Sequence, residues 1–99
     1  MSIGIREYPI PSVGGVNRSP VATVSLPAGA VVLSVFTAPG DQPRLVVRGD
    51  TGQALGDRSF VAVKQNVALN AAEIAGTYVG SFTGCRTDTG LELYHLLEI

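Results

Sequence analysis

Two apolar runs and the turn between them decide the fold of this chain: residues 21–37 read VATVSLPAGAVVLSVFT. Both runs are rich in Val, Ser and Thr, which is typical of β-strands separated by turns. Pro27 at the second turn position and Gly29 with a positive φ predict a tight reversal between the runs. Because nearly every residue of 31–36 is apolar, we expect the second strand to be central and covered on both faces.

Similar apolar segments recur along the 99 residues, and twelve Gly and six Pro residues separate them. A spacing of about ten residues between strand starts is typical of sandwiches and barrels. The sequence therefore predicts one all-β domain over residues 1–99, a small antiparallel sandwich or barrel of about six to seven short strands. The expected strands cover residues 3–8, 21–26, 31–37, 44–48, 59–64, 78–82 and 91–97.

The segments between these strands carry different signals. Asn70 and Gly76 bracket a short helix-forming cluster, so we expect one helical turn near 70–76, capped by the Asn and ended by the Gly. Residues 9–20 hold three Pro and little apolar pattern, which predicts irregular structure. Residues 39–43 (PGDQP) predict a turn, and residues 87–90 (TDTG) predict the turn of a hairpin between the last two strands.

Composition excludes several classes of protein. Hydrophobic residues make up 45% and charged residues 15% of the chain, which is not the composition of a disordered protein. A net charge of −1 excludes a nucleic-acid-binding protein that works through bulk positive charge. No apolar run approaches the roughly 20 residues of a membrane span, and the start of the chain does not resemble a signal peptide. We therefore expect no membrane partner and a reduced, cytosolic setting.

The residues that carry chemistry are few. The glycines form neither of the phosphate-binding patterns of nucleotide-binding α/β folds. Cys85 is the only cysteine, so an internal disulfide and a multi-cysteine metal site are excluded. His95 is the only histidine and interrupts an apolar face, so it is either a partly buried ring or a ligand contact. Cys85 and His95 would pair poorly across the hairpin, and we expect a structural thiol. The prediction is a protein that is not an enzyme, with no cofactor and no metal.

Arginine dominates the cations: six of the seven cationic residues are Arg, which suits bidentate recognition of phosphate or carboxylate. Arg44 and Arg48 share one strand face, and Arg58 and Lys64 share a face of the next strand. If these two strands pair as a hairpin, the four cations line one recess. The alternative is a solvated face on which the cations pair with carboxylates of the chain, namely Asp50, Asp57 or Glu73.

Four blocks of sequence occur in an order that a known family shares: LPAGAVVLSV at 26–35, RSF at 58–60, YVGSF at 78–82 and HLLE at 95–98. Over about residues 20–98 the chain resembles a family of small uncharacterised proteins from tailed bacteriophages. It departs from the family pattern in having KQNV at 64–67 in place of Gly-Thr-Gly-His and no Trp after Leu45. The resemblance implies a β fold and a phage accessory protein located in the host cytoplasm or in the virion, and it implies no reaction.

The first hypothesis for function is a non-catalytic binding protein that sequesters a small anionic molecule, such as a nucleotide signal of bacterial immunity. In such a site Arg would hold phosphate, an aromatic ring would stack on a base and amides would bind its edge. The candidate ligand-binding residues are Arg44, Arg48, Arg58, Lys64, Gln65, Asn66, Tyr78, Tyr94 and His95.

Two alternatives remain open at this point. One is a minor virion or assembly component whose unpaired strand edges are completed by another chain. The other is a protein that inhibits a host target. Low charge and a mostly apolar last strand lead us to expect a homo-oligomer in each case, with a ligand site between subunits under the binding hypothesis.

Overall fold

The computed structural model describes residues 2–10, 17–39, 42–87 and 90–99, with side chains for all of these except residues 85–87, 90 and 91. Strands make up most of this structure, together with one short helix. The elements are β1 (Ile3–Pro9), β2 (Ala22–Pro27), β3 (Val31–Ala38), β4 (Gln42–Asp50), β5 (Leu55–Lys64), α1 (Ala71–Ala75), β6 (Thr77–Thr87) and β7 (Gly90–Glu98).

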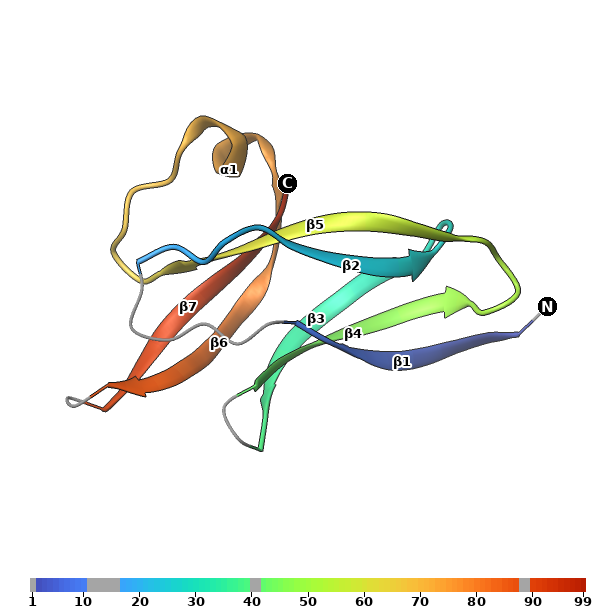
Figure 1. Cartoon of the computed structure of the whole chain (residues 1–99), viewed down its shortest axis with the longest axis horizontal. Coiled ribbons are helices and arrows are strands. Elements are labelled where there is room, and N and C mark those ends of the chain that lie inside the picture. Colours follow the sequence, from blue (N-terminus) through green and yellow to red (C-terminus); the bar gives the residue numbers. More distant parts are fainter. Residues whose placement is uncertain (1, 11–16, 40–41, 88–89) are drawn as a thin grey trace.

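Within the described residues, the strands form a small all-β sandwich of two antiparallel sheets, which confirms the predicted fold class. Sheet A has the strand order β1-β4-β3, and sheet B has the order β2-β5-β7-β6. Figure 1 shows β1, β4 and β3 side by side, β6 beside β7, and α1 above β5 near the C-terminus. All seven predicted strands are present, most of them longer than predicted.

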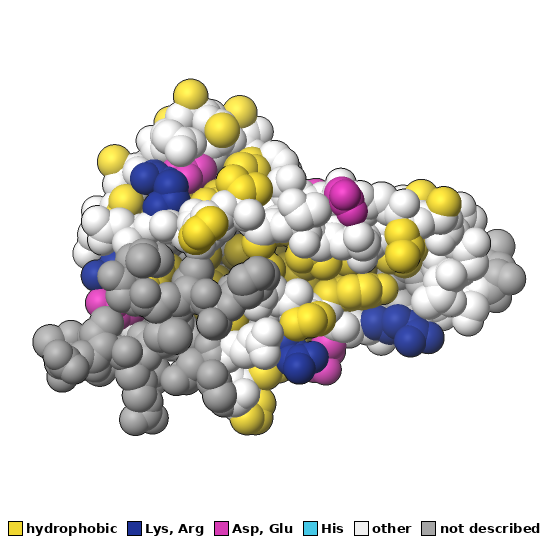
Figure 2. All heavy atoms as spheres, in the orientation of Figure 1, with side chains coloured by type: hydrophobic (Ala, Val, Ile, Leu, Met, Phe, Trp, Pro, Cys, Tyr) yellow, Lys and Arg dark blue, Asp and Glu magenta, His cyan; other side chains and the backbone are white. Residues whose placement is uncertain are grey.

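The core lies between the two sheets and is built by alternate residues of each strand. Leu45 and Val47 of β4 face Phe60 of β5 and Tyr94 of β7, and all four side chains are almost completely buried. The ring of Phe82 on β6 stacks on Tyr94, with ring centroids 5.8 Å apart. Hydrophobic side chains fill the space between the layers in Figure 2. This burial follows from the period of two along each strand, which directs every second side chain inward.

The turn at residues 27–30 connects the two sheets. The N–H of Ala30 donates to the carbonyl of Pro27 at 3.0 Å, and Gly29 has a φ of 76°, so the predicted positive φ at this glycine is confirmed. From the sequence we expected Pro27 at the second position of this turn. It is instead the first residue, because the hydrogen bond that closes the turn ends on its carbonyl. Because β2 belongs to sheet B and β3 to sheet A, the reversal moves the chain from one layer to the other.

The expectation that residues 31–36 form a central, doubly covered strand is wrong. Strand β3 lies at the edge of sheet A, and its Val31 and Leu33 are exposed. A β-bulge between Val32 and Ser34 shifts its register against β4. A run of apolar residues does not distinguish a covered strand from an edge strand with one open face, because both bury alternate residues such as Val35.

Helix α1 begins and ends where the sequence predicts. The side chain of Asn70 accepts a hydrogen bond from the N–H of Glu73, and the side chain of Glu73 accepts one from the N–H of Asn70, both at 2.9 Å. This reciprocal pair is a capping box, and Gly76 is the C-cap. A helix of five residues is too short to be stable alone, so its position depends on what holds Glu73.

Strands β6 and β7 pair antiparallel, with Thr87 opposite Gly90, as the predicted hairpin requires. The turn residues Asp88 and Thr89 lie outside the described residues, as do Gly40 and Asp41 of the other predicted turn and residues 11–16 of the predicted irregular segment. In the described part of the chain, no helix has the length and apolar character that crossing a membrane requires.

Candidate functional site

The strands that carry the four predicted cations lie in different sheets. Strand β4 pairs with β1 and β3, and β5 pairs with β2 and β7, so the hairpin between β4 and β5 that a shared recess of the four cations requires is not formed. The connection crosses from sheet A to sheet B at residues 51–54. The structure therefore places Arg44 and Arg48 on one sheet and Arg58 and Lys64 on the other.

Arg58 is engaged by the protein itself. Its Nε and Nη2 donate to the two carboxylate oxygens of Glu98 at 2.6 and 2.7 Å, and its Nη1 donates to the carbonyl of Ala30 at 2.5 Å. The hydrogen bonds to Glu98 raise the pKa of Arg58 above its usual value. At the other end of β5, Lys64 Nζ forms an ion pair with Glu92 at 2.9 Å. The partners of Arg58 and Lys64 are therefore Glu98 and Glu92, and not the carboxylates that we considered from the sequence.

Arg44 and Arg48 share the outer face of sheet A, as predicted, because Leu45 and Val47 between them point into the core. Arg48 and Asp50 both line a pocket of about 300 Å³. The Asp50 carboxylate accepts hydrogen bonds from the N–H groups of Ser2 and Gly52, at 3.0 and 2.9 Å, and these lower its pKa. Neither arginine has a salt bridge to the described residues, and neither borders the pocket that we describe next.

The structure brings five of the nine predicted ligand-binding residues together around one pocket of about 190 Å³. They are Lys64, Gln65, Asn66, Tyr78 and His95. These residues come from the end of β5, the turn that follows it, the start of β6 and the middle of β7. They converge because β7 pairs with both β5 and β6.

Tyr94, the remaining predicted residue, lies on the opposite face of β7 from His95. Its side chain is fully buried, with 0% exposure, and its ring stacks on Phe82 in the core. Its hydroxyl donates to the Glu92 carboxylate at 3.2 Å. The ring of Tyr94 is therefore not accessible to a ligand, and its role is packing.

A tight turn sets the rim of the pocket. The N–H of Val67 donates to the carbonyl of Lys64 at 3.2 Å, and Asn66 at the third position has a φ of 71°. Asn tolerates this left-handed conformation better than most residues other than Gly. The N–H of Gln65 donates to the carbonyl of Leu93 on β7 at 2.8 Å, which fixes the turn against the sheet.

His95 joins the two sides of the pocket through both ring nitrogens. Gln65 Oε1 can only accept, so His95 Nε2 donates to it, and in the neutral imidazole Nδ1 then accepts from the Tyr78 hydroxyl at 2.8 Å. The rings of Tyr78 and His95 are tilted by 41°, with centroids 5.7 Å apart. Tyr78 remains 56% exposed, so one large aromatic surface is held in place and open to solvent.

The inner wall of the pocket is apolar. Val63 and Leu97 are buried and pack with Val61 in a second hydrophobic cluster, and the partly buried Val67 packs against this cluster. Leu69, which is exposed, completes the lining. An apolar wall with a few polar groups at its rim is the usual composition of a small-molecule site.

The residues that line this pocket offer hydrogen-bonding groups, an aromatic face and an apolar wall to a ligand. Both ring nitrogens of His95 form hydrogen bonds within the protein, one with the Tyr78 hydroxyl and one with Gln65 Oε1. Among the residues that the structure describes, no cluster of His, Cys, Asp or Glu could hold a metal ion. The side chain of Cys85, which we expected to be a structural thiol, lies outside the described ones.

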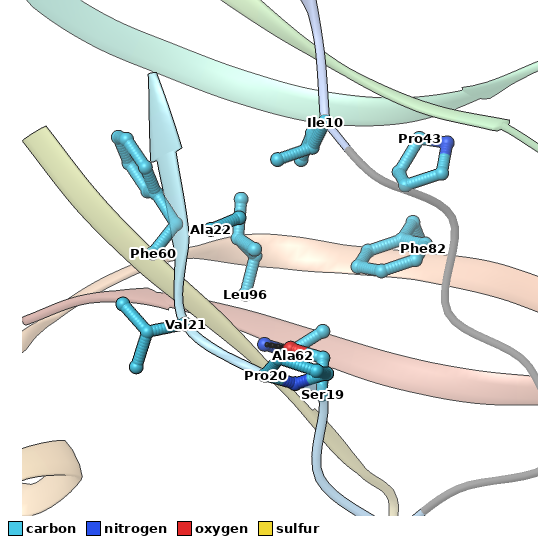
Figure 3. Close-up of a pocket in the computed structure, with 10 residues that line it drawn as sticks. All are labelled: Ile10, Ser19, Pro20, Val21, Ala22, Pro43, Phe60, Ala62, Phe82 and Leu96. Carbon is cyan, nitrogen blue, oxygen red and sulfur yellow. Dashed lines mark hydrogen bonds between the residues drawn. The ribbon is translucent and has the colours of Figure 1, made fainter.

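A further pocket of about 130 Å³ opens between the two sheets near β2 and is apolar (Figure 3). Ile10, Phe60, Phe82 and Leu96 line it, and Ser19 supplies its one side-chain hydroxyl. That hydroxyl oxygen already accepts the N–H of Ala62 at 2.9 Å. Ser19 is therefore the only polar side chain among the described residues of this lining, and its hydroxyl proton is the one side-chain donor that they offer to a ligand.

Sequence reasoning missed the ion pair between Arg18 and Glu73. Arg18 Nε and Nη2 donate to the two carboxylate oxygens of Glu73 at 2.5 and 2.7 Å, and Nη2 also donates to the carbonyl of Ala68 at 2.8 Å. Glu73 is almost completely buried, and the hydrogen bonds from Arg18 lower its pKa. The spacing Asn70-x-x-Glu73 signalled the capping box, but nothing in the sequence indicated a distant arginine.

Comparisons of the chain with known protein families, with curated proteins and with solved structures found no match.

Proposed function

We propose that this chain is a non-catalytic binding protein that captures a small anionic ligand of nucleotide type in the pocket between Tyr78, His95 and the 64–67 turn. The observation that carries the proposal is the convergence of Lys64, Gln65, Asn66, Tyr78 and His95 on one pocket from three separate parts of the chain.

The exposed ring of Tyr78 supports a planar ligand. Its hydroxyl is bonded to His95, which restricts rotation of the side chain while leaving more than half of its surface exposed. A nucleobase stacked on such a ring gains about 1–3 kcal/mol. The apolar wall formed by Val63 and Leu97 would shield one edge of the base from water.

Polar groups at the rim supply the remaining recognition. The amide of Asn66, exposed at the tip of the turn, can bind the donor and acceptor groups along the edge of a base. Lys64 is the cation in the lining of this pocket among the described residues. Its side chain lies on the Tyr94 face of the sheet, where Nζ pairs with Glu92 at 2.9 Å. In the proposed complex the ammonium group leaves Glu92, turns around the end of β5 and contacts the phosphate as a single charge and not as a bidentate fork.

The biological setting follows from the family resemblance. A small phage accessory protein that binds a nucleotide without converting it would act by sequestering the molecule inside the infected cell.

Calorimetric titration of the full chain with nucleoside monophosphates, cyclic nucleotides and cyclic dinucleotides tests the proposal. We expect saturable binding of at least one of them. Tyr78→Ala should weaken binding about 5- to 150-fold through loss of stacking, whereas Tyr78→Phe should retain most of the affinity. Lys64→Ala should weaken binding of a nucleotide and leave binding of the matching nucleoside unchanged, because only the nucleotide carries phosphate.

Arg44→Ala and Arg48→Ala are charge-matched controls, since both residues lie on sheet A away from the pocket. They should leave affinity unchanged. No heat with any ligand in the series would overturn the proposal. So would binding that depends on Arg44 or Arg48 and not on Tyr78.

A further inference from the structure

The outer edge of β1 is exposed. Strand β1 is the first strand of sheet A and pairs with β4 on one side, and no described residue pairs with its other side. Six of its seven residues are exposed, with Ile5 at 65% and Ile3 at 57%. A free edge with exposed isoleucines is a ready template for pairing with another chain.

The ladder between β1 and β4 shows which backbone groups face this edge. Thr51 N–H donates to the carbonyl of Ser2 at one end of the ladder, and Ile10 N–H donates to the carbonyl of Pro43 at the other. The register between them has no shift, and hydrogen-bonded pairs alternate with non-bonded pairs in antiparallel sheets. Even-numbered residues of β1 therefore bond to β4. The N–H and C=O groups of Ile3, Ile5 and Glu7 point outward.

The other edge strands are protected. The free edge of β2 is short and lies between Pro20 and Pro27, and proline is a common device against edge pairing. At the remaining two edges, β3 and β6 lie against each other: Thr37 Oγ1 on β3 donates to the carbonyl of Thr83 on β6 at 2.6 Å. Of the edges that the structure describes, β1 alone has no such protection.

We infer that the chain forms a two-fold dimer in which the β1 strands of two copies pair antiparallel, with Ile5 opposite Ile5 of the partner subunit. In this register Ile3 faces Glu7 of the partner subunit, so the outward groups of all three odd-numbered residues find partners. The two copies of sheet A become one continuous sheet. This inference is independent of the Tyr78 pocket, which lies on sheet B.

Charge and side-chain size select the register. A shift of one residue toward the end of β1 would place Arg6 opposite Arg6 of the partner subunit, and a shift of two would place Glu7 opposite Glu7 of the partner subunit. Like charges directly opposite each other are destabilising. The register centred on Ile5 avoids both and packs two β-branched side chains across the dimer axis, a favourable cross-strand pair. A shift of one residue the other way, centred on Gly4, would place Glu7 opposite a residue beyond the described part of β1, so fewer of the outward groups would find described partners.

Sedimentation equilibrium of the full chain, over a concentration series up to about 1 mM, measures the association. We expect a monomer–dimer equilibrium. Ile5→Lys should raise the dissociation constant at least tenfold, because it places two ammonium groups opposite each other at the axis. The side chain of Ile5 is exposed, so the monomer should stay folded by circular dichroism.

Two controls separate pairing through the edge from other contacts. Leu55→Lys changes a residue of similar exposure on β5, and Val31→Lys changes an exposed residue of sheet A on β3. Both variants should dimerise like the original chain. A monomer at about 1 mM, a dimer unaffected by Ile5→Lys, or a dimer that Val31→Lys dissociates equally well would overturn the inference.

Amide hydrogen exchange provides a second readout. In the dimer the N–H groups of Ile3, Ile5 and Glu7 should become protected as concentration rises, whereas those of Gly4 and Arg6 should be protected at every concentration by the ladder with β4. Equal protection of odd and even residues in the monomer would contradict the assignment of the free edge.

Discussion

Gly84 on β6 occupies a position where no side chain fits. A Cβ atom built there would overlap the ring of Tyr94, which packs directly over the glycine backbone and stacks on Phe82. The absence of a side chain at residue 84 is therefore what allows a full tyrosine ring into the core. It also explains why Tyr94, an attractive ligand-binding residue in the sequence, is a core residue in the structure.

We expect Gly84→Ala to destabilise the protein by about 1–3 kcal/mol, the usual cost of overpacking a core. Urea denaturation followed by tyrosine fluorescence measures this. Gly56→Ala on β5 is the matched control, because a Cβ there meets no atom within 4 Å. It should change stability by less than about 1 kcal/mol. Equal effects of the two substitutions would show that Gly84 is not constrained by Tyr94.

At the scale of the element, the stability of helix α1 depends on the Glu73 carboxylate, because a helix of five residues is too short to be stable by itself. Glu73 completes the capping box with Asn70 and receives two hydrogen bonds from Arg18, which lies next to Val63 of β5 through an isolated β-bridge. The helix is thereby tied to sheet B beside the Tyr78 pocket. A carboxylate that is buried in this way must remain charged to keep its partners.

The pH dependence of stability should report this arrangement. The pKa of Glu73 is lowered in the folded state, first by the hydrogen bonds from Arg18 and also by that from the Asn70 N–H. Its contribution is therefore fully present above the usual carboxyl pKa of about 4.3 and is lost as pH falls through the lowered value. Glu73→Gln should thus destabilise the protein at pH 7 and progressively less below about pH 4.

Denaturation of the original chain and of the Glu73→Gln variant between about pH 2 and pH 7 measures the difference. In an Arg18→Met background, most of the pH-dependent part of that difference should disappear, because the main cause of the lowered pKa has been removed. A difference in stability between the two proteins that is constant over the whole pH range would contradict this account.

At the scale of the whole molecule, Arg58 holds the two sheets together at the end of the sandwich. It bonds Glu98 at the end of β7 and the carbonyl of Ala30, which ends the turn from β2 to β3. One side chain thus joins the last strand of the chain to the crossing between sheets. The planar guanidinium, with donors on three nitrogens, is suited to bridging these groups at once.

We expect Arg58→Met to cost about 1.5–3 kcal/mol, the range for hydrogen bonds that involve charged groups. Thermal and urea denaturation measure it. Arg48→Met removes a cation with no salt bridge among the described residues and should lie within about 0.5 kcal/mol of the original chain. If both substitutions lowered stability by a similar amount, the loss would come from removing a positive charge and not from breaking a specific link between the sheets.

Much of the fold could be predicted from local sequence. The seven strands and the capped turn of helix follow from alternation, from Gly and Pro positions and from the pair Asn70 and Gly76, which act within a few residues of where they stand. Part of the site could be predicted too. Tyr78 and His95 meet because β6 and β7 form the predicted hairpin, whereas Gln65 and Asn66 join them because β5 pairs with β7 and not with β6, which the sequence did not indicate.

What the amino-acid order determined alone is therefore local: which segments are strands, where glycine turns the chain, and which side chains share a strand face, as Arg44 and Arg48 do. Only the tertiary structure decided which strands are neighbours. Alternation marks a face as apolar or polar but does not specify the sheet it packs against, and so the separation of β4 from β5 could not be foreseen. For the same reason, the link that Arg58 forms between the sheets and the open edge of β1 are visible only in the tertiary structure.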